Sequence, residues 1–221
     1  MAGSSPAWPV FRVVIWINIL LAAGSLACRW WELPDWPHLY LPLDWESLMA
    51  GRWWSCFTYM WIHAPFEGVG VFHIVCNMTT LAPFGRAVEG VLGRGRFWAL
   101  YLSGGLGGAA GFVLETFIRQ EWCGVPEGGH PGMVGASAAV LGVVTAFALL
   151  FPQARMGLMF LPFRLRAGWF LLGFALLSTA FLFVPAAGFI AHSAHLGGML
   201  GGWLCMRYGV GMRRDPQEIR Y

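Results

Sequence analysis

Four polar side chains of types that do chemistry lie within apolar stretches of this chain: His73, Asn77, Ser137 and His195. A hydroxyl beside an imidazole can become a nucleophile, because the ring accepts the hydroxyl proton. A carboxamide and a second imidazole are donors of the kind that stabilise an oxyanion. The residue types therefore predict nucleophilic catalysis by a hydroxyl, with donors for the negative charge that develops.

The composition around these residues is that of a membrane protein. Of 221 residues, 57% are hydrophobic and 11% are charged, and the mean hydropathy is +0.60. A soluble domain carries roughly 25% charged residues, so this chain lacks the polar surface that water requires. The composition argues against a soluble enzyme, a disordered protein and a nucleic-acid binder, and it predicts one membrane-embedded domain over residues 1–221.

Six stretches are long and apolar enough to cross a bilayer, which takes about 20 mostly apolar residues per helix. They cover residues 10–28, 71–88, 97–117, 133–151, 167–184 and 188–206. This pattern predicts an all-α protein with six transmembrane helices and a short cytoplasmic tail at 207–221. We expect the first stretch to be retained, because its removal as a signal peptide would leave five spans and break the alternation of charge.

Arginine supplies all fourteen basic residues, and its placement predicts the orientation. Eleven arginines lie before the first span, after the second and fourth spans, and in the tail. Three lie in the alternate connections, which also hold most of the acidic residues. Because cytoplasmic loops carry the excess of basic residues, we expect both termini inside, with spans two, four and six starting at the outer side.

The first connection, residues 29–70, is expected to lie in the outer membrane interface. Four prolines interrupt it, yet it holds seven of the thirteen tryptophans. Tryptophan favours the headgroup level, where its apolar ring and its polar N–H are both accommodated. Short interfacial helices would shelter this aromatic surface, whereas the alternative, a floppy external loop, would expose it to water.

The polar residues inside the spans are expected at one depth. His73 and Asn77 are one turn apart and share a helix face. Ser137 is about four residues into its predicted span, roughly 6 Å, and His195 is about seven residues into its own, roughly 10 Å. Since an acidic residue within a span would be costly, we expect a Ser–His pair without an acidic third member.

Glycines near these groups predict close contact between helices. Gly135 precedes Ser137 by two residues, and Gly198 follows His195 by three, on the same helix face. Gly198 also forms a small-xxx-small pair with Gly202, which lets helix backbones approach each other closely. We expect this contact to bring the hydroxyl and the imidazole within hydrogen-bond distance.

Three motifs resemble those of the rhomboid intramembrane serine proteases. His73-Ile74-Val75-Cys76-Asn77 resembles the HxxxN motif of the second span, and Gly135-Ala136-Ser137-Ala138 resembles the GxSG motif at the start of the fourth. Ala194-His195-Leu196-Gly197-Gly198 resembles the AHxxG motif of the sixth span. The resemblance runs from about Leu48 to Gly202, which is most of the chain.

The resemblance implies a six-helix rhomboid bundle with an interfacial first loop, acting as a serine endopeptidase on transmembrane helices of membrane-protein substrates. Ser137 would be the nucleophile and His195 the general base. His73, Asn77 and the backbone N–H of Ser137 would form the oxyanion hole. The resemblance implies no cofactor and no metal. The partners would be these substrates and the lipid bilayer, without nucleic acid. We expect an integral, multi-pass protein of the bacterial inner (plasma) membrane whose site opens to the outer side.

Three features depart from the family pattern. Ala138 stands where the GxSG motif has its second glycine. The usual Trp-Arg pair of the first connection is replaced by Arg52-Trp53-Trp54-Ser55. The stretch from His63 to His73 is also longer than in typical members, so we expect His63 to be shifted from its family position.

Other interpretations remain open from the sequence. Considered without the other polar residues, Ser137 would be interpreted as a helix serine whose hydroxyl is hydrogen-bonded to the backbone of its own helix. His192, three residues before His195, is the alternative base. A metal site at His73, His192 and His195 would lack both the HExxH pattern and a nearby carboxylate.

The sequence leaves two alternative functions open, and it also carries two histidines outside the predicted spans. The alternative functions are a non-catalytic rhomboid-like protein that binds membrane helices, and a small transporter that uses the polar cluster as its pathway. His38 and His130 lie in external connections and are expected to be solvated.

Overall fold

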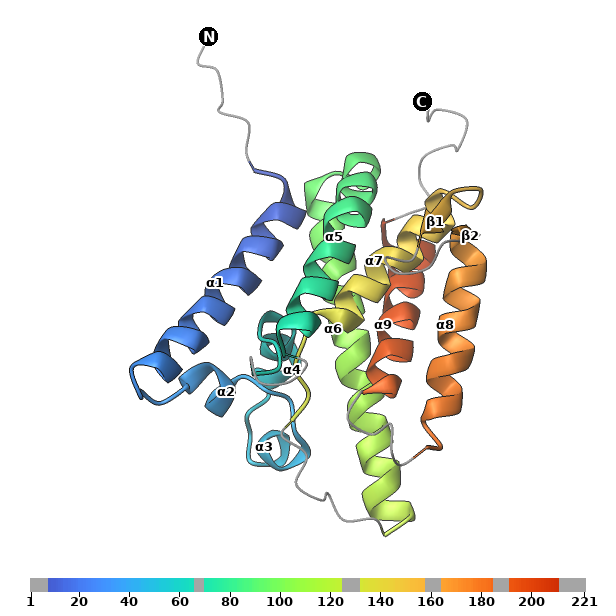
Figure 1. The fold of residues 1–221 in the computed structure, drawn as a ribbon. Coiled ribbons are helices and arrows are strands. Elements are labelled where there is room, and N and C mark those ends of the chain that lie inside the picture. Colours follow the sequence, from blue (N-terminus) through green and yellow to red (C-terminus); the bar gives the residue numbers. More distant parts are fainter. Residues whose placement is uncertain (1–7, 66–69, 125–131, 158–163, 185–190, 211–221) are drawn as a thin grey trace.

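The computed structural model of the chain describes residues 8–65, 70–124, 132–157, 164–184 and 191–210. Within them, long helices occupy all six regions where the sequence predicts spans (Figure 1). They are α1 (Val10–Trp30), α5 (Gly70–Leu92), α6 (Arg94–Phe117), α7 (Ser137–Leu150), α8 (Ala167–Phe181) and α9 (His192–Leu204). The predicted helical bundle is therefore present, with α6, α7 and α9 packed together at its centre.

Short elements connect these helices. They are α2 (Trp36–Tyr40), α3 (Trp45–Met49), α4 (Ser55–Thr58), a 3-10 turn η1 (Tyr59–Trp61), and two π-helical turns, η2 (Ile118–Trp122) and η4 (Cys205–Val210). One feature differs from an all-α fold: β1 (Arg155–Gly157) pairs antiparallel with β2 (Arg164–Arg166). These two paired strands lie between α7 and α8, in a connection where the sequence predicted no strand.

The predicted helix starts differ most from the observed ones at α7 and α9, two of the three helices that carry candidate residues. The fourth span was expected from residue 133, but α7 begins at Ser137, because Gly135 adopts a φ of +116° that no helix contains. The sixth was expected from residue 188, but α9 begins at His192. The predicted positions within the two helices were therefore wrong: Ser137 is the first residue of its helix, and His195 is three residues into its own, while their depth in a membrane stays a prediction.

By length and composition, two helices among the described residues are candidate membrane spans: α1, and α6 together with its π-helical extension to Trp122. Two others, α7 and α8, are apolar but shorter. The six-span topology, the orientation and the tail stay predictions, and residues 211–221 of the tail lie outside the described residues.

The centre of the bundle is α7. Ten of its fourteen residues are buried, including Val140, Val143 and Val144. By contrast, α8 lies at the outside of the bundle, and its buried residues are only Ala167 and Ser178. A helix that is apolar on every face fits an interior position, and α7 is enclosed in this way by α5, α6, α8 and α9.

A buried carboxylate joins α1 to α5. Glu89 accepts hydrogen bonds from the backbone N–H of Val10 (2.7 Å) and of Phe11 (2.9 Å). These N–H groups belong to the first turn of α1, where backbone N–H groups have no acceptor within the helix. The negative charge also lies at the positive end of the helix dipole, so Glu89 fixes where α1 begins against α5.

The first connection forms the short helices that the sequence predicts. Asp44 caps α3 by accepting from the Ser47 N–H (2.7 Å). Five of the tryptophans in this connection are exposed on the surface: Trp30, Trp31, Trp36, Trp53 and Trp54. Their position in a membrane interface stays a prediction.

Candidate active site

The hydroxyl and the imidazole singled out in the sequence are hydrogen-bonded to each other. Ser137 Oγ lies 2.9 Å from His195 Nε2, although 58 residues separate them in the chain. The other ring nitrogen, His195 Nδ1, is buried and has no hydrogen-bond partner in the described structure. The ring packs against Phe174 of α8, with 5.6 Å between the ring centroids. The pair therefore sits in apolar surroundings.

Backbone contact between α7 and α9 sets this distance. A Cβ added at Gly198 would overlap the backbone carbonyl of Ala138, the residue next to Ser137. One turn further along, a Cβ at Gly202 would meet the backbone of Gly142. Glycine at both places lets the two helices touch main chain to main chain, as the small-residue spacing predicts.

The third helix, α6, holds α9 from the opposite side by the same means. Gly107 of α6 faces Gly197 of α9, and a Cβ on either would overlap the carbonyl of the other. Gly111 similarly faces the carbonyl of Ser193. The glycines of α6 were not predicted to take part in this contact, although Gly107 and Gly111 have the same spacing of four residues.

The segment before Ser137 is fixed by the first connection. Leu43 and Met133 exchange two backbone hydrogen bonds (3.0 and 2.7 Å), and the Gly135 N–H donates to the Tyr59 carbonyl (3.0 Å). Tyr59 in turn donates its hydroxyl to the Gly105 carbonyl of α6 (2.7 Å). This chain of contacts determines where the helix after it starts.

The start of α7 gives Ser137 a second chemical property. The N–H groups of the first helical turn have no acceptor within the helix, and the helix dipole makes this end positive. The Ser137 N–H is therefore a donor placed next to its own hydroxyl. Gly135 contributes a positive φ just upstream, where a residue with a side chain would be strained.

His73 lies against this same segment. A Cβ at Gly135 would come within 2.6 Å of His73 Cε1 and Nε2, so the ring occupies the space that a side chain there would fill. Asn77, one turn along α5, is buried, and its Nδ2 donates to the His73 carbonyl (2.9 Å). The structure thus brings His73 to the Ser137 segment, while the Asn77 amide is bonded to its own helix.

His63 has a role in the structure that the sequence did not reveal. It is 4% exposed, and its ring meets that of His73 edge-on, with 5.0 Å between centroids. Burial, together with the neighbouring His73 and His38, lowers the pKa of His63 to about 3, so the ring is neutral at ordinary pH. His63 and His73 are ten positions apart in the chain, and their rings nevertheless lie in contact.

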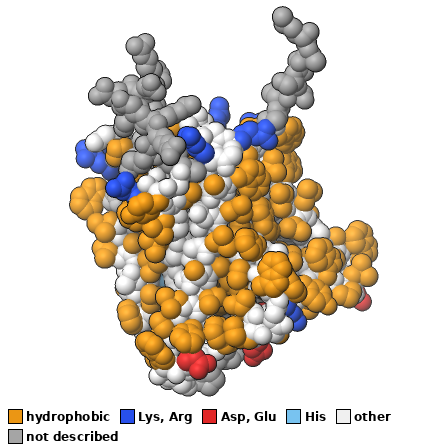
Figure 2. Space-filling model, turned by 180° about the vertical axis from the view of Figure 1, so that it is seen from behind, with side chains coloured by type: hydrophobic (Ala, Val, Ile, Leu, Met, Phe, Trp, Pro, Cys, Tyr) orange, Lys and Arg blue, Asp and Glu red, His pale blue; other side chains and the backbone are white. Residues whose placement is uncertain are grey.

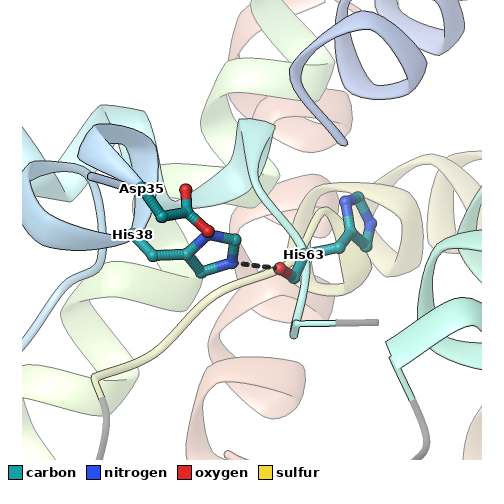
Figure 3. Close-up of polar contacts among 3 residues, drawn as sticks. All are labelled: Asp35, His38 and His63. Atoms are coloured by element: carbon teal, nitrogen blue, oxygen red, sulfur yellow. Dashed lines mark hydrogen bonds and ion pairs between the residues drawn. The ribbon is translucent and has the colours of Figure 1, made fainter. Parts of the chain in front are cut away.

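His38 was expected to be solvated, and this was wrong. Its Nδ1 lies 3.0 Å from Asp35 Oδ2, and its Nε2 lies 2.7 Å from the His63 carbonyl (Figure 3). The ring thus bridges the Asp35 carboxyl group and the His63 carbonyl oxygen. His38 thereby connects α2 to the backbone of His63. Because both ring nitrogens already have protein partners, the side chain does not need water to satisfy them. His130 lies outside the described residues.

Two departures from the expected pattern also have structural partners. Arg52 donates to Ser47 Oγ (3.2 Å) and to the Leu39 carbonyl (3.4 Å), so it links the short helices of the first connection. The methyl group of Ala138 packs where a Cβ at Gly108 of α6 would be, so the smaller glycine is on the opposite helix.

The alternative candidates are not bonded to Ser137. His192 is buried, its two ring nitrogens have no hydrogen-bond partner in the described structure, and its ring packs on Phe181 at 5.2 Å. Within the described residues, no three His, Cys, Asp or Glu side chains gather as a set of metal ligands. All five cysteines are free.

These features define a class: a bundle of apolar helices that encloses a serine hydroxyl hydrogen-bonded to a histidine, with a helix N-terminus at the serine. Comparison with known proteins identifies the family. The Rhomboid domain matches residues 50–211, and the chain therefore belongs to the rhomboid family. Members of this family are integral membrane proteins, and the family includes proteases.

Individual relatives agree with this membership. The chain is 34% identical over 155 residues to the presenilin-associated rhomboid-like protein, mitochondrial, of Bos taurus, which covers 68% of this chain and 39% of the relative. It is 31% identical over 160 residues to the rhomboid protease GluP of Bacillus subtilis, covering 72% of this chain and 26% of the relative. It is 29% identical over 177 residues to RHOMBOID-like protein 6, mitochondrial, of Arabidopsis thaliana, covering 80% and 49%. The chain spans about two fifths of the length of the mitochondrial presenilin-associated relatives.

Proposed function

We propose that this chain is an intramembrane serine endopeptidase in which Ser137 is the nucleophile and His195 the general base. The observation that carries the proposal is the 2.9 Å hydrogen bond between Ser137 Oγ and His195 Nε2. Family membership and the similarity to a protein named as a rhomboid protease support it.

The proposed reaction follows from the geometry. His195 Nε2 takes the proton of Ser137 Oγ as the oxygen attacks a peptide carbonyl. The Ser137 N–H and the His73 ring are positioned for the oxyanion, and Asn77 joins them by turning its amide from the His73 carbonyl. The imidazolium then gives its proton to the leaving amine. Water, deprotonated by the same ring, hydrolyses the ester and restores the serine.

The lack of an acidic third member fits the surroundings. A buried carboxylate would be costly among apolar helices, and no hydrogen bond to His195 Nδ1 is found in the described structure. The apolar packing on Phe174 orients the ring instead. A Ser–His dyad, rather than a triad, is thus the form of the site that these residues support.

The proposal includes placement in the membrane. Six spans with both termini on the cytoplasmic side would leave the serine opening toward the outer side. In support, Figure 2 shows most visible arginines at one end of the molecule and acidic side chains at the other. Transmembrane helices of other membrane proteins are the proposed substrates. The relatives include mitochondrial and bacterial proteins by name, so the expected bacterial inner membrane stays a prediction.

The test is cleavage of a single-span substrate after both proteins are reconstituted in vesicles. Ser137→Ala is expected to lower the cleavage rate by at least about 10³-fold, since loss of a nucleophile removes the covalent path. Ser193→Ala is the matched control, because this nearby buried hydroxyl has no hydrogen-bond partner in the described structure, and it should cleave normally. Undiminished cleavage by Ser137→Ala would refute the proposal. Capture of the helix without cleavage by the wild type would instead favour a non-catalytic rhomboid-like protein.

A further inference from the structure

A groove of about 600 Å³ runs between α1 and α5, and none of the candidate active-site residues lines it. It lies where α1 begins and α5 ends, since Glu89 of α5 caps the first turn of α1. One wall includes Arg12, Ile15 and Ile19 of α1, and the other is formed by Ala82, Pro83 and Arg86 of α5.

The groove has a charged mouth and an apolar interior. Along α1 the spacings of three and four residues place Arg12, Ile15 and Ile19 on one helix face. The distance from Arg12 to Ile19 along the axis is roughly 10 Å, or two turns. Both arginines are exposed, and among the described residues no acidic side chain lines the groove. The mouth therefore carries two positive charges, above walls of apolar side chains.

The nearby acidic residue, Glu89, is not among the residues that line the groove. Glu89 is buried, and its two carboxylate oxygens are occupied by the N–H groups of Val10 and Phe11. The same contact removes these N–H groups as anion donors, so an anion here would be held by the guanidinium groups alone. The Arg12 guanidinium lies 5.8 Å from the centre of the Phe11 ring, which helps to orient it.

Two tryptophans mark the level of the mouth. Trp8, just before α1, and Trp16 of α1 also line the groove and are 60% and 50% exposed. Exposed tryptophan with basic residues is typical of the headgroup level, where the ring contacts acyl chains and the N–H reaches polar groups.

We propose that this groove binds one anionic phospholipid, with its phosphate at Arg12 and Arg86 and an acyl chain along Ile15, Ile19 and Ala82. Two guanidinium groups bind a phosphate group well, and basic pockets between membrane helices take anionic headgroups. A transmembrane helix of a partner protein fits less well. Such a helix needs about 20 residues to cross the bilayer, whereas the groove from Arg12 to Ile19 is only about two helical turns long. A bound lipid would fill the gap between α1 and α5 below their contact at Glu89.

The experiment measures binding of phosphatidylglycerol to the full chain in neutral detergent, with phosphatidylcholine and inorganic phosphate as comparison ligands. Wild type is expected to bind phosphatidylglycerol more tightly than either. Arg12→Gln with Arg86→Gln should weaken this binding by about 30-fold, at roughly fivefold per arginine. The double variant Arg94→Gln with Arg96→Gln makes the same charge change at exposed positions outside the groove, and it should bind as wild type.

A third variant tests the acyl chain. Ala82→Trp fills the apolar part of the groove and leaves both arginines in place, so it should weaken phosphatidylglycerol binding, while circular dichroism and unfolding temperature show that the fold is kept. Equal losses in the two arginine double variants would overturn the proposal in favour of diffuse charge attraction. Equal binding of the two lipids, phosphate binding as tight as the lipid's, or full binding by Ala82→Trp would also overturn it.

Discussion

The two sides of the candidate site are built differently. On the serine–histidine side, α6, α7 and α9 touch backbone to backbone at glycines, and the hydroxyl and the imidazole are already within hydrogen-bond distance. On the oxyanion side, His73 is held by side-chain contacts with His63 and Gly135, and Asn77 is bonded to its own helix. In the proposed site, main-chain packing therefore preorganises the Ser–His pair, whereas the proposed oxyanion donors would be completed only by a movement of Asn77.

The largest expected effect comes from adding one methyl group between α7 and α9. Gly198→Ala should lower the free energy of unfolding by about 1–3 kcal/mol, because the new Cβ overlaps the Ala138 carbonyl and the helices must separate. The same separation should reduce kcat/KM by at least about 10²-fold, since a misplacement of about 1 Å costs that much.

The matched control is Gly173→Ala in α8, which also replaces a helical glycine but has open space around it. We expect its stability and cleavage rate to equal or slightly exceed those of wild type, because alanine favours a helix. Cleavage by Gly198→Ala at the wild-type rate would mean that main-chain packing does not set the dyad distance.

Removal of an oxyanion donor should act on catalysis with little effect on the fold. Asn77→Ala is expected to lower kcat by about 10²–10³-fold, as loss of one oxyanion donor does elsewhere, with KM nearly unchanged. The Nδ2 bond to the His73 carbonyl is local to α5, so its loss should cost little stability. Steady-state cleavage kinetics separate the two parameters.

Thr79→Val is the control for this variant, because Thr79 also donates its side-chain hydrogen bond to its own helix, at the Val75 carbonyl, but is exposed. It should leave kcat unchanged. A full kcat for Asn77→Ala would show that the amide stays bonded to its helix during the reaction, and that the Ser137 N–H and His73 are sufficient.

The histidine that supports the oxyanion side should make stability depend on pH. Burial lowers the pKa of His63 to about 3, from an ordinary value of 6.5. Between these values the unfolded chain binds a proton that the folded chain does not, so stability falls as the pH falls, by up to about 1.4 kcal/mol per pH unit. Above pH 6.5 this contribution is fully present.

Denaturant unfolding of wild type and His63→Gln between pH 7 and pH 4 measures this effect. The variant should lose less stability on acidification, and the difference between the two slopes isolates His63 from the other histidines. Parallel slopes would show that His63 is solvated, which would contradict its packing against His73.

The sequence predicted the helices well and their ends less well. The six apolar runs coincide with six helices of the bundle, of which two are long and apolar enough to be candidate membrane spans. The start of α7 at Ser137 depends on the φ of Gly135 and on backbone hydrogen bonds that Met133 and Gly135 form with Leu43 and Tyr59, which lie far away in the chain. Such long-range contacts leave no local pattern.

The same limit applies to the candidate site. The motifs correctly predicted that Ser137 and His195 lie close together, because each of these residues stands beside glycines on a helix face. The burial of His63 and the bonds of His38 to Asp35 and to a backbone carbonyl could not be predicted, since both depend on how the first connection folds back. A histidine in a connecting segment gives no sign of which acceptors will surround it.

Labelling of the folded protein with a fluorophosphonate tests the central claim most directly, because this reagent reacts with a serine whose hydroxyl is activated by a base. We expect one adduct on wild type, mapped to Ser137 by mass spectrometry, none on Ser137→Ala, and a greatly reduced amount on His195→Ala. An unlabelled wild type, an adduct on a different serine, or full labelling of His195→Ala would contradict the account.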